Sequence, residues 1–405
     1  MNLSQLARSI SESPTLKLNE AARRLREKGE PVIHLGGGEP TSRTPIDAIV
    51  RCTAVLNTGE VRYAPADGIP ALKQAVIRYT EDHYGRKPRP ENVLISSGTK
   101  HAIMVALHAV LDPHEEVIIP APYWASYPEM VRIAGGVPVK VVAEDGGFIP
   151  SVDEIAEAVG SHTKAVIVNS PHNPTGVVYP PEVVAGIVRL CEERGLFLIV
   201  DDIYNRLLFD GRTATNVYDY CGSDIDASRV IVVNGVSKTY AMTGFRVGWA
   251  IGAPDLIRAM GNIQSQETSG AATPSQWAAV GALNGVQSSV ETLRLTLQNN
   301  RNVMIERLRA IPGVQVTEPG GAFYCFPDFK AYRTDSQQLA AFLLEKVRVV
   351  TIPGREFGMD GHLRLSFCAS TKEIIEGLER IRWALDPSTP NELYVGDHRL
   401  VRDWL

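Results

Sequence analysis

The chain has 405 residues, of which 44% are hydrophobic and 21% are charged, and its formal net charge is −5 at pH 7. This length and apolar content predict a folded protein of two domains and exclude an intrinsically disordered chain. The acidic balance argues against nucleic acid or an anionic membrane as the main partner.

The cysteines and the N-terminal segment indicate a cytoplasmic protein. The five cysteines are scattered, odd in number and never spaced as Cys-x-x-Cys, which is typical of reduced thiols. Charged residues interrupt the start of the chain, so it does not resemble a signal peptide. No apolar run reaches the roughly 18 residues that a membrane helix needs.

The first predicted element is a helix over about 16–28. Short runs rich in valine and isoleucine then alternate with longer segments of helical periodicity. The runs lie at 92–95, 117–119, 165–168, 196–200 and 230–233, with an additional strand at 247–251. The alternation predicts an α/β fold with a largely parallel sheet, and the continuous apolar character of the runs predicts helices on both faces.

The C-terminal part is expected to form a smaller α/β domain. A long helix over about 288–310 leads into it. The segments 313–326, 347–350 and 363–367 are then predicted as strands, and a helix over about 371–384 completes the domain.

The predicted domains are a large one at 45–285 and a small one formed by 1–44 together with 286–405. The tail at 386–405 has two interpretations that stay open. Tyr394 and Trp404 favour packing on the small domain or on a partner subunit, whereas the proline and charged residues of the tail favour disorder.

Polar segments follow the predicted strands of the large domain. They are Ser96–Lys100, Pro122–Trp124, Asn169–Gly176, Asp201–Tyr204 and Asn234–Lys238. Ligands of open α/β sheets bind outside the carboxyl ends of the strands, so we expect these segments to converge on one crevice.

Two short motifs suggest nucleotide binding, but neither has the required context. Gly36-Gly37-Gly38 is followed by Glu39-Pro40 and not by a helix start, so the dinucleotide pattern fails. Lys238-Thr239 resembles the end of a phosphate-binding loop, but Ser237 stands where that motif needs glycine. The nine histidines show no metal-ligand spacing, so no metal site is predicted.

The side chains at the strand ends suit a phosphorylated pyridine aldehyde. A lysine can bind the aldehyde as a Schiff base, and a carboxylate can keep the pyridine nitrogen protonated, which makes the ring an electron sink. A hydroxyl and an amide can bind the phenolic oxygen, an indole can stack on the ring, and a guanidinium can bind the phosphate. These groups are supplied by Lys238, Asp201, Tyr204, Asn173, Trp124 and Arg246.

Several motifs occur in order along the chain. They are Tyr63-Ala64-Pro65 with Gly68, Pro122–Pro128, Pro171–Gly176, Asp201–Tyr204, Ser237-Lys238 and Ala241–Arg246. Together they resemble the fold-type I aminotransferases that use pyridoxal phosphate, and more closely the bacterial aspartate aminotransferase branch. The similarity extends from about Ser13 to about Ala384. It implies a mostly parallel seven-stranded sheet in the large domain and an exchange of amino groups between an amino acid and a 2-oxo acid.

The resemblance also implies roles for individual residues. Lys238 would form an aldimine with the cofactor and move the proton at the substrate Cα. Asp201 would pair with the pyridine nitrogen, while Tyr204 and Asn173 would bind the ring oxygen. Trp124 would stack on the ring, although Tyr123 beside it is an alternative.

The phosphate and the substrate are assigned in the same way. The resemblance places the phosphate on Arg246 and the Gly98-Thr99-Lys100 segment, with Ser237 as a further cofactor contact. Arg364 and the Gly38 N–H would bind the substrate α-carboxylate, and Trp124 and Asn173 would also face the substrate. Tyr63 matches a tyrosine that reaches the phosphate of the neighbouring subunit, so a homodimer with shared active sites is expected.

Lys100 is the residue expected to choose the substrate. It matches a lysine that meets the distal carboxylate of an acidic substrate, and Ser13 and Thr15 match hydroxyl residues of an N-terminal lid. An ammonium at this place favours aspartate, glutamate or prephenate. The alternative is that the Lys100 side chain faces water and only its backbone serves the phosphate.

Some positions depart from the pattern of the family. Thr41-Ser42-Arg43 replaces an Asp-Phe segment, so Arg43 would either add a second cation for an acidic substrate or face water. Asp202 stands where glutamate is more common, and Gly235 replaces a phosphate-binding serine. These departures bear on specificity and not on the cofactor.

Other functions remain open beside a transaminase for acidic substrates. The enzyme could act on aromatic or other neutral amino acids, or it could be a β-lyase that uses the same lysine. A regulator that only binds the cofactor would need a DNA-binding domain, for which the short N-terminal segment leaves no room.

Overall fold

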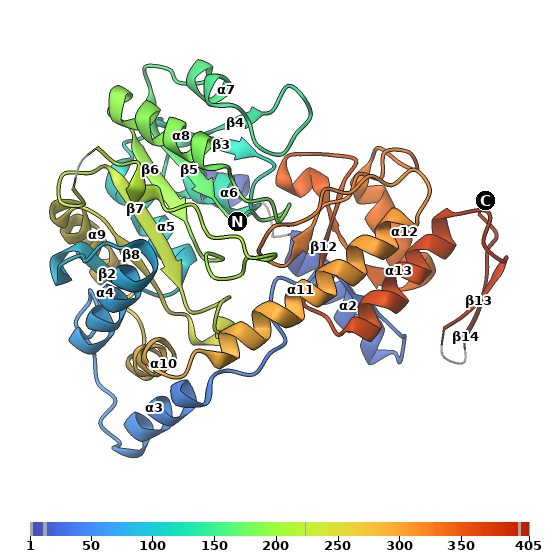
Figure 1. The fold of residues 1–405 in the computed structure, drawn as a ribbon, viewed down its shortest axis with the longest axis horizontal. Helices are drawn as coiled ribbons and strands as arrows, with labels where there is room; N and C mark the ends of the chain where they lie inside the picture. The colour runs from blue at the N-terminus through green and yellow to red at the C-terminus, as the bar shows by residue number, and fades with distance from the viewer. Residues whose placement is uncertain (1–2, 11–13, 223, 396–397, 405) are drawn as a thin grey trace.

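The computed structural model describes residues 3–10, 14–222, 224–395 and 398–404, with the backbone alone described at residues 9 and 14–17. Figure 1 shows the central sheet and its helices on one side of the molecule and the C-terminal helices on the other. The helix α11, which spans Ser288–Arg309, runs between the two sides.

The central sheet is mostly parallel and has seven strands, as expected. The strands are β2 Val93–Ser96, β3 Glu116–Ala121, β4 Val137–Val142, β5 Thr163–Asn169, β6 Phe197–Asp201, β7 Val230–Gly235 and β8 Gly248–Ile251. Their order is β2-β8-β7-β6-β5-β3-β4, and β8 is antiparallel to both of its neighbours. Apart from the antiparallel β8, the strands therefore end at the same edge of the sheet.

The edge strand β4 has no counterpart among the predicted runs. Its residues are mostly exposed or half-buried, and it carries Pro138 and Lys140. An edge strand pairs on one side only, so it tolerates such residues and lacks the continuous apolar pattern of the central strands.

Helices cover both faces of the sheet, which confirms the expected α/β architecture. Alternate residues of the central strands enter two different cores: Val166 and Leu198 face one layer, whereas Ile167 and Ile199 face the other. The first layer contains α4 Pro70–Tyr84, α7 Val152–Glu157, α8 Pro181–Arg194 and α10 Thr273–Asn284. The second contains α5 Thr99–Val110, α6 Ser126–Ile133 and α9 Pro254–Glu267. The helix α3 Ile46–Asn57 packs against α10.

A separate core lies in the C-terminal part of the chain. It includes residues of α11 and of α12 Ser336–Val347 and α13 Thr371–Leu385. The short strands β9 Tyr324–Cys325, β11 Ile352–Pro353 and β12 Leu363–Ser366 form an antiparallel sheet in the order β11-β12-β9. The predicted helices at 288–310 and 371–384 are therefore confirmed.

The prediction of a strand over 313–326 is wrong for most of that segment, because only β9 forms a strand within it. Gly313 has a φ of 76° and Ala322 a φ of 58°, and such left-handed residues interrupt an extended chain. The segment instead makes an isolated bridge at Gln315 and then turns through Gly320 and Gly321 toward the central sheet.

The N-terminal segment packs on the C-terminal part, as expected. It contains the helices α1 Gln5–Ser9 and α2 Pro14–Glu27, and the strand β1 Ile33–His34 pairs in parallel with β10 Val349–Val350. Ala22 of α2 is buried with Val32 and Val350. The domain boundaries at 44/45 and 285/286 stay a prediction.

The tail forms a hairpin of β13 Glu392–Val395 and β14 His398–Val401. Trp404 stacks edge-on against Trp383 and Phe342, and its Nε1 donates to the Ala384 carbonyl at 3.2 Å. Of the two interpretations of the tail, the structure favours packing on the C-terminal core, whereas Tyr394 is exposed.

The described residues contain no helix that is both long and apolar enough to span a bilayer. All five cysteines are free, and three of them, Cys191, Cys325 and Cys368, are buried.

Arg402 ties the tail to the end of α13, and its removal should destabilise this region. Its Nη1 donates to the carbonyls of Trp383 at 2.9 Å and Asp386 at 2.8 Å, and its Nη2 donates to the Thr389 carbonyl at 2.9 Å. We expect Arg402→Ala to lower the free energy of unfolding by about 2 kcal/mol, measured by denaturant titration, because several carbonyls lose their hydrogen bonds to a charged donor. Arg399→Ala in the same hairpin removes only an exposed ion pair with Glu392 and should change it by less than about 1 kcal/mol. Equal effects of the two substitutions would contradict the assignment.

Candidate active site

A cavity of about 340 Å³ lies at the carboxyl ends of the parallel strands, where the C-terminal part meets the central sheet. It collects most of the predicted site residues. Those that line it are Gly38, Thr99, Lys100, Trp124, Asn173, Asp201, Tyr204, Ser237, Lys238, Arg246 and Arg364. The predicted convergence of the strand ends on one crevice is therefore confirmed.

Of the predicted residues whose side chains or backbone the structure fully describes, Gly98 and Tyr63 are not among those that line this cavity. Tyr63 lies outside the cavity and is 93% exposed. Ser13 lies outside the described residues, and Thr15 is in α2 with its side chain not described. Their predicted roles stay predictions.

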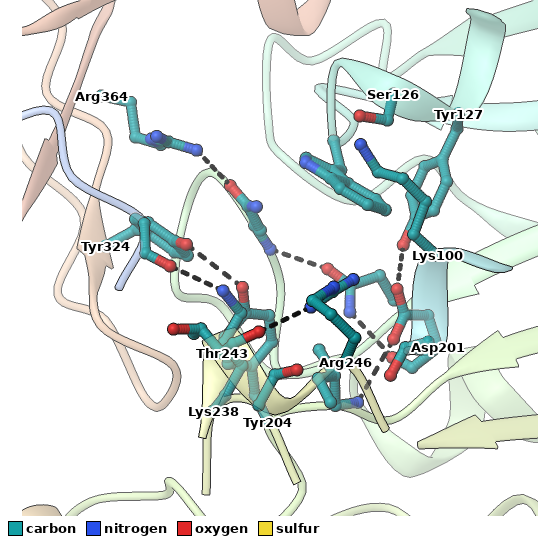
Figure 2. A pocket seen from close by; sticks show the side chains of 17 residues that line it. Lys100, Ser126, Tyr127, Asp201, Tyr204, Lys238, Thr243, Arg246, Tyr324 and Arg364 are labelled. Carbon is teal, nitrogen blue, oxygen red and sulfur yellow. Dashed lines mark hydrogen bonds between the residues drawn. The ribbon is translucent and has the colours of Figure 1, made fainter. Parts of the chain in front are cut away.

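Lys238 follows β7 and is half-buried in the cavity wall. Its Nζ donates to the Gly38 carbonyl at 2.6 Å, and Figure 2 shows the amine pointing into the cavity. Burial lowers the pKa of Lys238 to about 8, because the charged form loses its hydration. An amine of this kind is available in neutral form far more often than a surface lysine.

Asp201 is the last residue of β6, so the strand itself directs its carboxylate to the sheet edge. The Tyr127 hydroxyl donates to Oδ2 at 2.7 Å, and the Ile203 N–H donates to Oδ1 at 3.3 Å. Burial raises the pKa of Asp201 to about 6, while these hydrogen bonds and Lys238 act in the opposite direction. Asn169 fixes the neighbouring backbone by donating from Nδ2 to the Asp201 carbonyl at 2.8 Å.

Arg364 of β12 is 3% exposed and makes its contacts with neutral groups. Its Nη1 donates to Asn173 Oδ1 at 3.1 Å, and its Nη2 donates to the Gly36 carbonyl at 3.0 Å. Its Nε has no hydrogen-bond partner among the described residues. A buried guanidinium with a free donor suits a ligand carboxylate, to which it can bind in a bidentate manner.

The start of α5 and Arg246 form a cradle for an anion. Gly98 caps the helix with a φ of 88°, and a Cβ added there would lie 2.5 Å from Arg246 Nη2. Arg246 adopts a φ of 53° and donates from Nη1 to the Thr243 carbonyl at 2.9 Å. The Thr99 hydroxyl is buried without a partner among the described residues. Free backbone donors at a helix start and a guanidinium together fit a phosphate.

Trp124 and not Tyr123 lines the cavity, so the structure favours Trp124 as the stacking residue. The ring of Tyr123 instead lies against Gly358. The Lys100 ammonium sits 4.9 Å from the centre of the Trp124 ring, at the exposed side of the cavity. The Lys100 side chain therefore reaches the wall of the cavity. The alternative interpretation, in which only the backbone of Lys100 contributes to the site, is less favoured.

Six lining residues had no predicted role. They are Ser126, Tyr127, Asn169, Ile203, Thr243 and Tyr324. Asn169 and Ile203 belong to the strand-end segments, and Ser126, Tyr127 and Thr243 belong to the recognised motifs, so a sequence signal existed for them. Tyr324 comes from the C-terminal part, and no sequence signal pointed to it.

The departures from the family pattern have physical explanations. Arg43 is exposed and does not line the cavity. Of the two interpretations of Arg43, the structure therefore favours the one in which its side chain faces water. Asp202 is buried and accepts a hydrogen bond from the Tyr84 hydroxyl at 2.9 Å. A Cβ at Gly235 would lie 2.7 Å from Thr99 Oγ1 and 2.8 Å from the Val247 carbonyl, so a serine would not fit without a shift of the backbone.

Comparisons with known proteins agree with this site. Residues 30–381 match the family described as Aminotransferase class I and II. The aspartate aminotransferase of Streptomyces avermitilis is 42% identical over 386 residues, which cover 92% of this chain and 94% of the relative. A probable aspartate/prephenate aminotransferase of Aquifex aeolicus is 37% identical and covers 93% of this chain and 97% of its own length.

Solved structures show the same similarity. The structure of Thermus thermophilus aspartate aminotransferase with maleate has a TM-score of 0.89 at 36% identity, covering 94% of this chain and 99% of that chain. The chain belongs to the class I and II aminotransferase family. The predicted resemblance to the bacterial aspartate aminotransferase branch is confirmed, and the protein is an enzyme of the transaminase class.

The buried carboxyl of Asp202 should make stability depend on pH. Burial raises the pKa of Asp202 to about 7, above the roughly 3.9 of an unfolded aspartate. The native state therefore binds more protons between these values, and stability from this group falls as pH rises from about 4 to about 7. We expect the free energy of unfolding of Asp202→Asn, relative to the wild type, to increase over that range in urea titrations without added ligand. Asp255→Asn, which changes an exposed carboxylate, is the control and should show a constant difference. A constant difference for Asp202→Asn as well would contradict the assignment.

Proposed function

We propose that this enzyme uses pyridoxal 5′-phosphate to transfer the amino group of an acidic amino acid to a 2-oxo acid. The observation that carries the proposal is the meeting of a half-buried amine, a buried carboxylate and a buried guanidinium in one cavity, from Lys238, Asp201 and Arg364. The enzyme class comes from the family, whereas the cofactor, the roles of the residues and the substrate are inferred from the chemistry of these groups.

The residues present fit the proposed cofactor. In the proposal, Lys238 would attach its aldehyde, Asp201 would pair with its ring nitrogen, and Tyr204 and Asn173 would bind its ring oxygen; all four line the cavity. Trp124 offers a face for the ring. The phosphate ligands would be Arg246, Ser237 and the Gly98, Thr99 and Lys100 backbone. When bound, the cofactor supplies an aldehyde that takes up amino groups and a ring that stabilises negative charge at the substrate Cα.

Asp201 and Lys238 control the protonation states that the reaction needs. Asp201 is ionised above a pH of about 6, because Tyr127 and the Ile203 N–H offset part of the burial that raises its pKa. It can therefore keep a ring nitrogen protonated at neutral pH. Lys238, with its pKa lowered to about 8 by burial, can accept a proton at Nζ from the substrate Cα and return it to the product.

Arg364 orients the substrate through its α-carboxylate. Its stacking on Tyr324 and its hydrogen bonds to Asn173 and Gly36 hold the guanidinium in one place. Binding a carboxylate at a fixed guanidinium places the Cα–H bond near Lys238 and increases the effective concentration of the reacting groups.

Lys100 supports the choice of an acidic substrate. Its ammonium lies at the Trp124 ring on the open side of the cavity, where a distal carboxylate could reach it. The relatives named aspartate and aspartate/prephenate aminotransferases support the same class. Aromatic donors and prephenate remain the alternative substrates, and β-elimination remains the alternative reaction.

A homodimer with shared active sites is part of the proposal. The side chains of Ile46 and Val50 on α3 and of Val286 are 68%, 57% and 72% exposed, and an apolar surface of this kind suits contact with a second copy. Tyr63, also fully accessible, would reach the phosphate of the neighbouring subunit. We further propose a cytoplasmic location, with small amino and oxo acids as the partners.

Lys238→Ala tests the proposed reaction. The wild type should convert aspartate and 2-oxoglutarate to oxaloacetate and glutamate, and Lys238→Ala should reduce the turnover by at least about 10⁴-fold, because the attachment and proton-transfer group is lost. Borohydride reduction followed by mass spectrometry should find the cofactor on Lys238 in the wild type only. Conversion of cysteine, which carries a leaving group on Cβ, to pyruvate, ammonia and hydrogen sulfide without formation of glutamate would show a lyase, and a fully active Lys238→Ala would overturn the assignment.

Lys100→Ala tests the proposed substrate class. We expect kcat/KM for aspartate and glutamate to fall by about 10-fold to 100-fold, because an exposed charge-assisted contact is removed, and kcat/KM for phenylalanine to change by less than about threefold. A donor panel assayed with the wild type and the variant measures this. Equal losses for acidic and aromatic donors would show that Lys100 does not contact the substrate side chain. Arg43→Ala, which changes a cation outside the cavity, serves as the control.

A further inference from the structure

Tyr324 of β9 contacts Tyr204, which is proposed above to bind the cofactor, and Arg364, which is proposed to bind the substrate. Tyr324 itself has been given no role so far. It is 1% exposed and lines the cavity. Its hydroxyl lies 3.2 Å from the hydroxyl of Tyr204, and Figure 2 shows the two hydroxyls facing each other. A residue of the C-terminal part thus touches the proposed ligand of the cofactor ring oxygen.

The ring of Tyr324 contacts the proposed carboxylate ligand. The Arg364 guanidinium carbon lies 4.5 Å from the centre of this ring and 4.9 Å from that of Phe357. Contact with aromatic faces is favourable for a cation that is removed from water. The Nη1 and Nη2 groups donate to neutral acceptors, so the aromatic faces supply much of the compensation for the buried charge.

The hydroxyl of Tyr324 also lies close to the backbone at Gly38. A Cβ at Gly38 would stand 3.2 Å from Tyr324 Oη, and the Gly38 carbonyl accepts the Lys238 amine. Tyr324 is therefore in contact with three parts of the chain: Gly38 of the N-terminal segment, Tyr204 just after β6, and Arg364 of β12. Such a residue cannot shift without moving one of these groups.

The distance between the two hydroxyls allows either one to be the donor, and the charged groups beside them favour Tyr324. Burial raises the pKa of Tyr324 to about 12, with the neighbouring Arg364 acting to lower it. Burial raises the pKa of Tyr204 well above its ordinary value, and Asp201 and Tyr324 raise it further. A cation against a phenol ring makes its hydroxyl the better donor, and the Arg364 guanidinium carbon lies 4.5 Å from the centre of the Tyr324 ring. With Tyr324 as the donor, the proton of Tyr204 is free for another acceptor.

We propose that Tyr324 is a positioning residue that donates from its hydroxyl to Tyr204, which directs the Tyr204 proton toward the ring oxygen of the cofactor. Its ring holds Arg364 in place for the substrate carboxylate. The hydroxyl and the ring therefore serve different halves of the site. This inference rests on the proposed function.

Two variants separate the hydroxyl from the ring. Tyr324→Phe removes only the hydroxyl. In the holoenzyme, the absorbance of the bound cofactor changes with pH, and the midpoint of this change should rise by about half a pH unit because Tyr204 becomes a weaker hydrogen-bond donor. The kcat of this variant should fall about threefold to tenfold. Its affinity for succinate, a dicarboxylate probe measured by calorimetry, should stay within about twofold. Tyr324→Leu also removes the ring and should weaken succinate binding by about fivefold or more.

Tyr218→Phe is the matched control. Tyr218 is also buried, lies outside the cavity, and has a hydroxyl without a partner among the described residues. It should move neither the pH midpoint nor the succinate affinity. A Tyr324→Phe enzyme with the wild-type midpoint, or with a lower one, would overturn the inference while leaving the proposed function intact. A wild type that neither binds the cofactor nor exchanges amino groups would overturn the proposed function and the inference together.

Discussion

Three charged groups that have lost much of their hydration face one cavity, and the surrounding structure compensates for that loss. Lys238, Asp201 and Arg364 each lose water, which shifts the pKa of all three toward the neutral form. Each is hydrogen-bonded to neutral groups, through the Gly38 carbonyl, the Tyr127 hydroxyl and the Asn173 amide oxygen respectively. Because these contacts are neutral, the charges stay available for a ligand.

The position of the cavity follows from the sheet. The strands β5, β6 and β7 run parallel and end together, so Asn169, Asp201 and the turn to Lys238 meet at one edge.

The anion cradle also requires that segments of the backbone approach one another closely. Gly98 and Gly235 leave room for Arg246 and Thr99 at the start of α5, where a side chain would collide with them. Helix geometry and small residues together form a cradle that fits an anion.

The sequence predicted much of this arrangement because the information is local. The apolar runs identified the central strands, and the polar residues directly after them supplied most of the cavity wall. The edge strand β4 escaped detection because one exposed side permits proline and lysine. The predicted strand over 313–326 failed because positive φ angles break the extended chain at positions where the residue types do not require it, as at Ala322.

The sequence by itself determined the fold class, the transaminase motifs and the identity of most cavity residues, since each depends on neighbours along the chain. Only the tertiary structure decided which aromatic residue lines the cavity, that the tail packs through Trp404 and Arg402, and that Tyr324 lies between Tyr204 and Arg364. These features join residues that are 19 to 120 positions apart in the chain, or depend on which side of a turn a side chain faces. Such contacts are set by tertiary packing, which no local pattern records.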